Sequence, residues 1–194
     1  MRFLVLVLSA ALLSGAAAAA PGDLSATDSV AAPHVTVSLV ADVDTVRAGA
    51  PFDAGIRFVL ERDWHVYWSN PGDSGLAPAV RWTLPEGTTA DPIVWPHPHR
   101  IVVGPLANFG YEGEVLLPVR IVPSPALAPG ESLTLAARVD WLVCKEDCLP
   151  GDAALRLVLP VVPGAATPSR WAPAFAAAHA RVPRVSRGIT VEAL

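Results

Sequence analysis

Turn-forming residues interrupt this chain at short intervals, and their spacing limits what it can fold into. The sequence holds 20 prolines and 14 glycines, and beyond residue 33 turn signals return about every 8–15 residues. Short segments lie between them in which apolar and polar residues alternate, the period of a strand with one buried face. The pattern predicts an all-β chain folded as an antiparallel β-sandwich, rather than strands that alternate with helices.

The alternation predicts about eight strands. One of them contains Pro118, which predicts an edge strand or a bulge because proline lacks the N–H that a central strand donates. Residues 70–75 and the proline-rich residues 91–99 are expected to form loops. The expected strands cover residues 34–43, 54–60, 64–68, 80–84, 101–103, 114–121, 132–143 and 154–159.

The N-terminal residues have the composition of an export signal. Arg2, the apolar run over 3–13 and the small residues that follow predict a signal peptide over residues 1–20. The run is shorter than the roughly 20 residues that a membrane span needs, and no later segment is a candidate span. Residues 21–33 are small and polar, which predicts a flexible arm.

The remaining chain predicts one domain over residues 34–163, large enough to bury a core. Residues 164–194 are expected to hold a linker, a short C-terminal helix over 170–181 and a partial trailing strand, the start of a possible second unit. Lys and Arg number 14 against 18 Asp and Glu. No basic block exists, which argues against nucleic acid and anionic membrane surfaces as partners.

The chain has two cysteines, Cys144 and Cys148. In an extended strand, residues four apart are separated by about 13 Å, whereas a disulfide requires Cα atoms within about 7 Å of each other. A bridge therefore requires a turn at residues 145–147, with each cysteine at the end of one strand of a hairpin. Export to an oxidising compartment permits such a bond.

The residues alone leave three interpretations of this pair. A structural staple that closes about five residues restrains the unfolded chain by roughly 2 kcal/mol, which is little for a domain of this size. Tight cysteine loops are typical of redox-active pairs. A metal site would need a cluster of soft ligands, and nothing in the sequence links His97 or His99 to the cysteines.

Charges next to the pair indicate a thiol that is not strongly activated in isolation. Lys145 favours the thiolate, which is the attacking species, while Glu146, Asp147 and Asp140 oppose it. Such a pair suits a carrier that exchanges only when docked to a partner. No Ser-His-Asp arrangement or paired-carboxylate motif supports a hydrolase.

Several motifs resemble the N-terminal periplasmic domain of the DsbD/ScsB family of thiol:disulfide interchange proteins, which are disulfide reductases. The resemblance spans roughly residues 35–163, and the three residues between the cysteines fit the ScsB-like branch better. The motifs are WHVYWSNPGDSG (64–75), IVWP (93–96), NFGYEG (108–113), LLPV (116–119), WLVC (141–144) and CLPG (148–151).

The resemblance implies an immunoglobulin-like sandwich in which Cys144 and Cys148 form the catalytic pair, with Phe109 or Tyr111 in a cap loop that shields the disulfide. It implies a protein-disulfide reductase component without metal or other cofactor. Electrons would pass from a membrane-linked or thioredoxin-like donor to periplasmic thioredoxin-fold client proteins. The expected location is the periplasm, with a tether to the inner membrane if the chain is part of a longer protein.

The alternative is a non-catalytic β-sandwich module for binding or assembly with a permanent structural disulfide. In that case the six tryptophans, several of which lie near Gly/Pro loops, would line a binding face. The two hypotheses differ in redox lability, because structural disulfides resist reduction by the glutathione pool.

Overall fold

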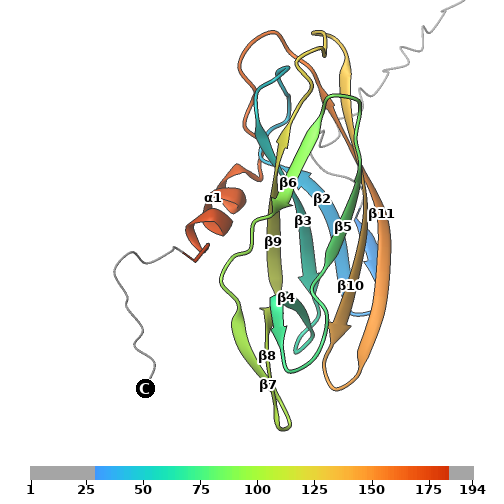
Figure 1. Ribbon diagram of the computed structural model, residues 1–194, viewed down its shortest axis with the longest axis vertical. Coiled ribbons are helices and arrows are strands. Elements are labelled where there is room, and N and C mark those ends of the chain that lie inside the picture. The colour runs from blue at the N-terminus through green and yellow to red at the C-terminus, as the bar shows by residue number, and fades with distance from the viewer. Residues whose placement is uncertain (1–28, 184–194) are drawn as a thin grey trace, which may run out of the picture.

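The computed structural model describes residues 29–183, which form two antiparallel sheets packed face to face and one helix outside them (Figure 1). The strands and the helix are β1 (Val30–Ala32), β2 (Val35–Ala41), β3 (Phe52–Leu60), β4 (His65–Gly72), β5 (Ala79–Thr83), β6 (Thr89–Ile93), β7 (His99–Val103), β8 (Leu106–Glu112), β9 (Glu114–Val122), β10 (Ser132–Cys144), β11 (Cys148–Pro160) and α1 (Ala172–Ala180). One sheet has the order β1-β2-β3-β9-β6 and the other β11-β10-β4-β8-β7, with β5 also paired to β10.

Alternation along the strands creates the core between the sheets. In β10 the odd-numbered residues from Leu133 to Val143 are all buried, whereas the even-numbered residues up to Leu142 are exposed or half-buried. Apolar side chains from both sheets fill the interior. The predicted all-β antiparallel sandwich is thus confirmed. The largest fully buried apolar side chains of the core include Leu39, Ile56, Phe58, Leu117, Ile121, Leu133, Leu135, Leu157 and Leu159.

The described residues contain three strands that the sequence pattern did not predict: β1, β6 and β8. β1 lies within the predicted flexible arm over 21–33, which is therefore too long at its C-terminal end, because Val30–Ala32 pair with β2. β6 (Thr89–Ile93) overlaps the first residues of the proline-rich loop expected over residues 91–99. β8 contains Asn and Gly, which are rare in strands, but it pairs with β4 on one side and β7 on the other. Pairing partners here override local propensity.

Pro118 does not lie on an edge, because β9 runs between β3 and β6. The Pro118 carbonyl accepts a hydrogen bond from the Val94 N–H over 2.7 Å, so its missing N–H faces the β6 side as well. The register of β6 against β9 shifts between Ala90 and Ile93. The sheet accommodates the absent donor through this irregularity, which agrees with the bulge alternative rather than with the edge alternative.

The short C-terminal helix is present as α1 and packs on the outer face of the first sheet. Phe175, only 2% exposed, forms a small cluster there with Val40 and Leu116. The Arg57 guanidinium lies 5.0 Å from the centre of the Trp171 ring, an attractive cation–π geometry. The predicted signal peptide and trailing strand lie outside the described residues. Among residues 29–183, no helix is long and apolar enough to span a membrane.

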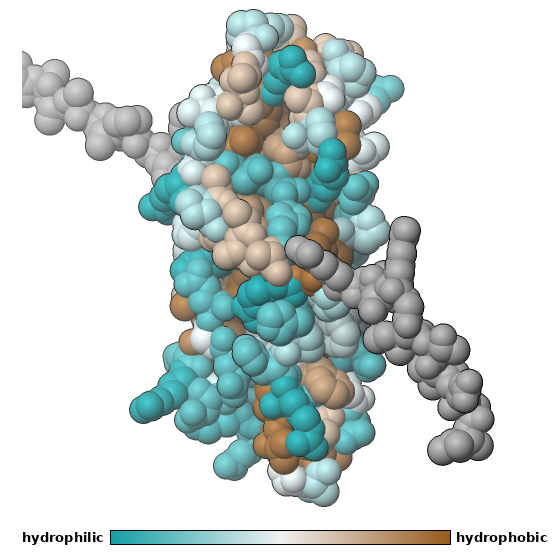
Figure 2. Space-filling view, turned by 90° about the vertical axis from the view of Figure 1, so that its left-hand side faces the viewer, coloured by the Kyte–Doolittle hydropathy of each residue, from teal (hydrophilic) through white to brown (hydrophobic). Residues whose placement is uncertain are grey.

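The surface on the α1 side is mixed in polarity. Figure 2 shows hydrophilic residues across most of this face, with apolar atoms gathered towards its lower end, where the β7–β8 hairpin projects in Figure 1. Val102 and Leu106, which flank the tip of that hairpin, are 59% and 38% exposed. The same end of the molecule carries the turn between β10 and β11 (Figure 1).

The alternating burial along β10 predicts that two truncations in this strand lower the free energy of unfolding by different amounts. Leu135→Ala removes a fully buried side chain and is expected to lower the free energy of unfolding by about 2–5 kcal/mol. Arg138→Ala on the outer face breaks an exposed ion pair with Asp152 and is expected to cost less than about 1 kcal/mol. Urea unfolding followed by tryptophan fluorescence measures both, and equal costs would contradict the assigned strand faces.

Candidate functional site: the disulfide of the β10–β11 hairpin

Cys144 and Cys148 form a disulfide at the end of the β10–β11 hairpin. They are the last cross-strand pair of the two strands, and their Cα atoms lie 4.2 Å apart. The chain turns at residues 145–147, where the Lys145 N–H donates to the Asp147 carbonyl over 3.2 Å. This geometry confirms the predicted three-residue loop with a cysteine at the end of each strand.

The two cysteines share a face of the sheet but differ in exposure. Both have even numbers in strands whose odd-numbered residues face the core, so both side chains lie on the outer face of the sandwich. Cys144 is nevertheless only 2% exposed, whereas Cys148 is exposed. An approaching thiol therefore meets Cys148 first.

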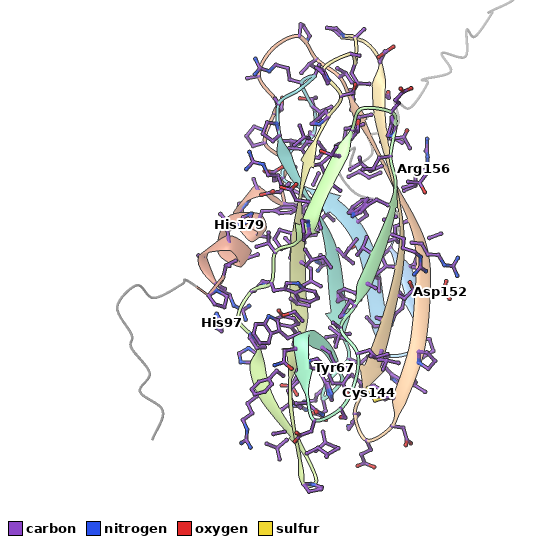
Figure 3. All side chains as sticks on the ribbon, viewed as in Figure 1. Tyr67, His97, Cys144, Asp152, Arg156 and His179 are labelled. Carbon is purple, nitrogen blue, oxygen red and sulfur yellow. A yellow bond between two sulfur atoms is a disulfide. The ribbon has the colours of Figure 1, made fainter. Side chains whose placement is uncertain are left out.

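Two rings of β4 lie beside the disulfide on this outer face. His65 is the cross-strand partner of Cys144, and Tyr67 lies two residues further along the same side of β4. The Tyr67 hydroxyl lies 3.6 Å from the Cys148 Sγ, and Figure 3 shows Tyr67 next to Cys144 at the lower end of the sandwich. The His65 and Tyr67 rings meet edge to face, with their centres 5.1 Å apart.

The loop after β4 covers the Tyr67 ring. Gly75 has a φ of +90°, and a Cβ at this position would lie 2.1 Å from Cζ of Tyr67, so only glycine fits there. The backbone N–H and the hydroxyl of Ser74 both donate to Oδ1 of buried Asn108, over 3.0 and 3.1 Å. Asn108 thereby holds the loop on β8, and the loop holds Tyr67 against the disulfide.

Burial shifts the titration of both rings. Desolvation raises the pKa of the Tyr67 phenol, and a hydrogen bond with the Ser74 side chain lowers it. Desolvation lowers the pKa of His65 from its ordinary value of 6.5, against the weaker opposing charge of Glu112. His65 is therefore neutral at pH 7. It is 1% exposed, and its buried Nε2 has no hydrogen-bond partner among the described residues.

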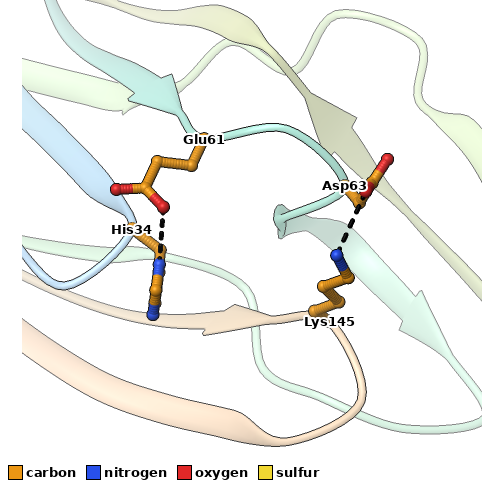
Figure 4. Close-up of polar contacts among 4 residues, drawn as sticks. All are labelled: His34, Glu61, Asp63 and Lys145. Carbon is orange, nitrogen blue, oxygen red and sulfur yellow. Dashed lines mark hydrogen bonds and ion pairs between the residues drawn. The ribbon is translucent and has the colours of Figure 1, made fainter.

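Two of the charges near the cysteines, on Lys145 and Asp140, are paired with opposite charges. Nζ of Lys145 lies 3.1 Å from Oδ2 of Asp63 (Figure 4), and Asp140 lies 2.6 Å from Arg81. Neither Lys145 nor Asp140 therefore acts on the sulfur atoms as an isolated charge. The Lys145–Asp63 pair also ties the hairpin loop to the turn between β3 and β4, although exposed pairs of this kind contribute at most about 1 kcal/mol.

A groove of about 480 Å³ lies next to the disulfide on the same outer face. Leu142 and Pro150, the outward-facing residues one step before Cys144 and one step after Cys148, line it. Leu76, which is 67% exposed, contributes from the loop that covers Tyr67, and Asp140 and Asp152 add carboxylates to the lining. The groove beside the disulfide is therefore apolar with an acidic margin.

The structure does not bring Phe109 or Tyr111 together with the cysteines. Tyr111 is the cross-strand partner of Val66, a core residue, so it lies on the inner face of the sheet, where its hydroxyl donates to the Pro96 carbonyl over 2.7 Å. Phe109 lies two residues away on the same side of β8. The aromatic residue that contacts the disulfide is Tyr67.

The candidate metal-binding histidines lie away from the pair. His97 bonds to the carbonyl of Arg181, after the end of α1, over 2.9 Å, and the His97 and His99 rings lie 6.4 Å apart. Over residues 29–183, no group of three or more His, Cys, Asp or Glu side chains is arranged to hold a metal ion.

His65 and Tyr67 are not identified as site residues by the sequence pattern alone. Both lie in the strand predicted over residues 64–68, where they flank apolar Val66 at a spacing of two. That spacing is the signal that could have identified them, because it places two polar-tipped rings on the face opposite the core. Which face also carries the cysteines depends on the pairing of β4 with β10, which local sequence does not specify.

Comparisons with known proteins agree with this architecture. The family model described as "Thiol:disulfide interchange protein DsbD, N-terminal" matches residues 34–160. The crystal structure of the N-terminal periplasmic domain of ScsB from Proteus mirabilis is similar, with a TM-score of 0.64 and 23% sequence identity, over 86% of this chain and 63% of that chain. The immunoglobulin-like sandwich is thereby confirmed.

Two more distant structures align over part of the chain. The GAE domain of yeast GGA1 has a TM-score of 0.38 and 12% identity over 68% of this chain and 95% of its own. The major pilin subunit BcpA of Bacillus cereus has a TM-score of 0.37 and 9% identity over 66% of this chain and 41% of its own. Similarity at this level carries no argument about function. No curated protein matches the chain.

The loop over Tyr67 predicts that Gly75→Ala alters the disulfide. The added Cβ overlaps the ring, so the loop and Tyr67 move away and the sulfur atoms become more accessible. Reduction by dithiothreitol, followed by thiol release, is expected to be several-fold faster than in the wild type. Gly130→Ala is the matched control, because Gly130 has a φ of +93° but no atom within 4 Å of the added Cβ. Equal rates in the two variants would refute the shielding role.

The lowered pKa of His65 predicts a pH dependence of stability. The unfolded chain binds a proton at His65 near pH 6.5, whereas the folded chain binds it only at lower pH. Stability is therefore lost as the pH falls below about 6.5, by at most about 1.4 kcal/mol per pH unit. His65→Phe is expected to lose less stability than the wild type between pH 7 and 5 in urea unfolding. Parallel pH profiles would show that His65 is not protected from protonation.

Proposed function

The chain belongs to the family of N-terminal domains of thiol:disulfide interchange protein DsbD, and on that premise we propose that it carries electrons through a reversible disulfide between Cys144 and Cys148. The family assigns it a general role in thiol–disulfide exchange. The proposal adds the identity of the reactive pair, the direction of electron flow and the class of partner. In this role the chain acts as a protein-disulfide reductase component and requires no cofactor.

The proposed location is the periplasm, reached through the signal peptide predicted over residues 1–20. The similar ScsB structure is described as an N-terminal periplasmic domain, and the chain spans 63% of the length of that structure. We propose that a membrane-linked or thioredoxin-like donor reduces the pair and that periplasmic thioredoxin-fold proteins receive the electrons.

The observation that carries the proposal is an exposed cysteine in a disulfide that the fold does not need. The disulfide closes a loop of three residues at the end of two strands that are already paired along 13 residues each. Closing so short a loop restrains the unfolded chain by only about 2 kcal/mol. Cys148 is exposed at the end of this hairpin, where a second protein can reach it.

The exchange follows from the unequal exposure of the two cysteines. A donor thiolate attacks Sγ of Cys148, the bond between the two sulfurs of this chain breaks, and Cys144 leaves as a thiolate that takes up a proton. The second donor thiolate then attacks the mixed disulfide and releases Cys148 as a thiolate, which is protonated in turn. Two electrons and two protons have moved to this chain, and the donor has become a disulfide. A client is reduced by the reverse sequence.

The surroundings suit exchange inside a complex rather than with any passing thiol. Cys144 is buried next to His65, its partner on β4, and Lys145 and Asp140 are paired with opposite charges. The groove formed by Leu76, Leu142 and Pro150 gives a partner an apolar surface next to Cys148. Burial of exposed apolar area supplies binding free energy of about 25 cal/mol per Å². A partner that docks in this groove therefore has its reactive cysteine close to the disulfide.

The reduction potential of the pair tests the proposal. The purified chain is equilibrated with thiol buffers of known potential, and free thiols are counted. A midpoint between about −180 and −280 mV, the range of known exchange proteins, is expected. A pair that remains oxidised below about −300 mV behaves as a structural disulfide and would favour the alternative of a non-catalytic binding module.

Trapping identifies the attacked cysteine. A thioredoxin-fold protein that lacks its resolving cysteine is activated as a mixed disulfide with a coloured thiol and mixed with Cys144→Ser or Cys148→Ser. The Cys144→Ser variant retains exposed Cys148 and is expected to form the cross-linked complex much faster. Faster capture by Cys148→Ser would reverse the assignment of the two roles.

A further inference from the structure

We propose that His65 is a positioning residue that favours the reduced state, because its Nε2 gains a hydrogen-bond partner in the Cys144 thiol only after the disulfide opens. This inference rests on the proposed exchange at the same cysteine pair. It assigns a role to a side chain that the chemistry of exchange leaves unused.

The strand register places the two groups together. His65 lies directly opposite Cys144 in the antiparallel pairing of β4 with β10. Directly opposed residues have their Cβ atoms about 4.5–5.5 Å apart and on the same side of the sheet. Cys144 therefore lies between two cross-strand neighbours, with Cys148 on β11 and His65 on β4.

In the oxidised state the imidazole is incompletely bonded. Nε2 of His65 is buried and has no hydrogen-bond partner among residues 29–183, and the whole side chain is 1% exposed. Buried polar atoms in folded proteins almost always have a partner, and leaving one without a partner is costly. The neighbouring Cys144 sulfur provides no donor, because it carries no hydrogen and is bonded to Cys148.

Reduction changes what Cys144 offers. The bond to Cys148 holds the Cys144 sulfur towards β11. Once two electrons and two protons have been added, the side chain is free to take another staggered rotamer on the β4 side. A thiol is both a weak donor and a weak acceptor, and neutral imidazole has one nitrogen of each kind. Nε2 therefore finds a partner in either tautomer.

Cys148 does not compete for this role. It is exposed on β11, and its sulfur lies near the Tyr67 hydroxyl, whereas the residue opposite His65 is Cys144 on β10. The released sulfur that remains buried during exchange is Cys144. The hydrogen bond thus stabilises the reduced form of the sulfur that leaves in the proposed first step, and it shifts the equilibrium towards the dithiol.

The test compares reduction potentials at pH 7 in the full chain. His65→Phe keeps a ring but removes both nitrogens, so the oxidised state loses its unpaired atom and the reduced state loses its hydrogen bond. The equilibrium constant for reduction is expected to fall about tenfold, which is a potential about 30 mV more negative. His65→Gln retains a donor and an acceptor and is expected to remain within about twofold of the wild type.

His99→Phe is the matched control, since His99 is exposed on β7, and its potential is expected to equal that of the wild type. An unchanged or less negative potential in His65→Phe would overturn the inference. If His65→Phe fails to fold, nitrogen NMR of the wild-type imidazole decides: the Nε2 resonance of His65 must shift on reduction, and an unchanged resonance overturns the proposal.

Failure of the His65 proposal can be distinguished from failure of the proposed function. The absolute midpoint of the wild-type pair tests whether the disulfide is exchange-competent. The ratio between His65→Phe and the wild type tests the hydrogen bond, and dithiothreitol buffers allow this ratio to be measured at any midpoint. Each result can fail while the other stands.

Discussion

The position of the site depends on the register of β10 against β11 and β4. The strand pairs with β11 through to the last residue, Cys144 opposite Cys148, and with β4 at the same residue on its other edge. Because side chains alternate between the faces of a strand, a shift of one residue would turn the cysteines into the core and Val143 out to solvent. Burial of the leucine-rich inner face fixes the register, so core packing also determines that the disulfide faces outward.

Outward-facing cysteines would ordinarily both be exposed, and the strand order makes them different. Cys144 lies between two cross-strand partners, Cys148 on β11 and His65 on β4, whereas Cys148 lies on β11 at the edge of the sheet. The result is a disulfide with one buried cysteine and one exposed cysteine. In the proposed exchange this asymmetry decides which sulfur is attacked and which one leaves.

The covered part of the outer face near the disulfide buries polar atoms, and their desolvation costs free energy that the apolar core does not lose. His65, Tyr67 and Asn108 bring polar atoms out of water, and His65 retains a nitrogen without a partner. A purely structural hairpin end would be better stabilised by apolar side chains of similar size. If the disulfide opens as proposed, an unpartnered polar atom beside it is the pattern expected where stability has been exchanged for reactivity.

The sequence by itself determined the fold class, the long β10 strand and the hairpin geometry of the cysteines, because alternation, turn residues and covalent geometry are local constraints. It did not reveal β8, whose Asn and Gly argue against a strand, and it placed the shielding aromatic residue at Phe109 or Tyr111 rather than Tyr67. Only the tertiary structure decided these points, because strand partners far apart in the sequence determine which residues share a face. Proximity across a sheet depends on register, and no local pattern encodes it.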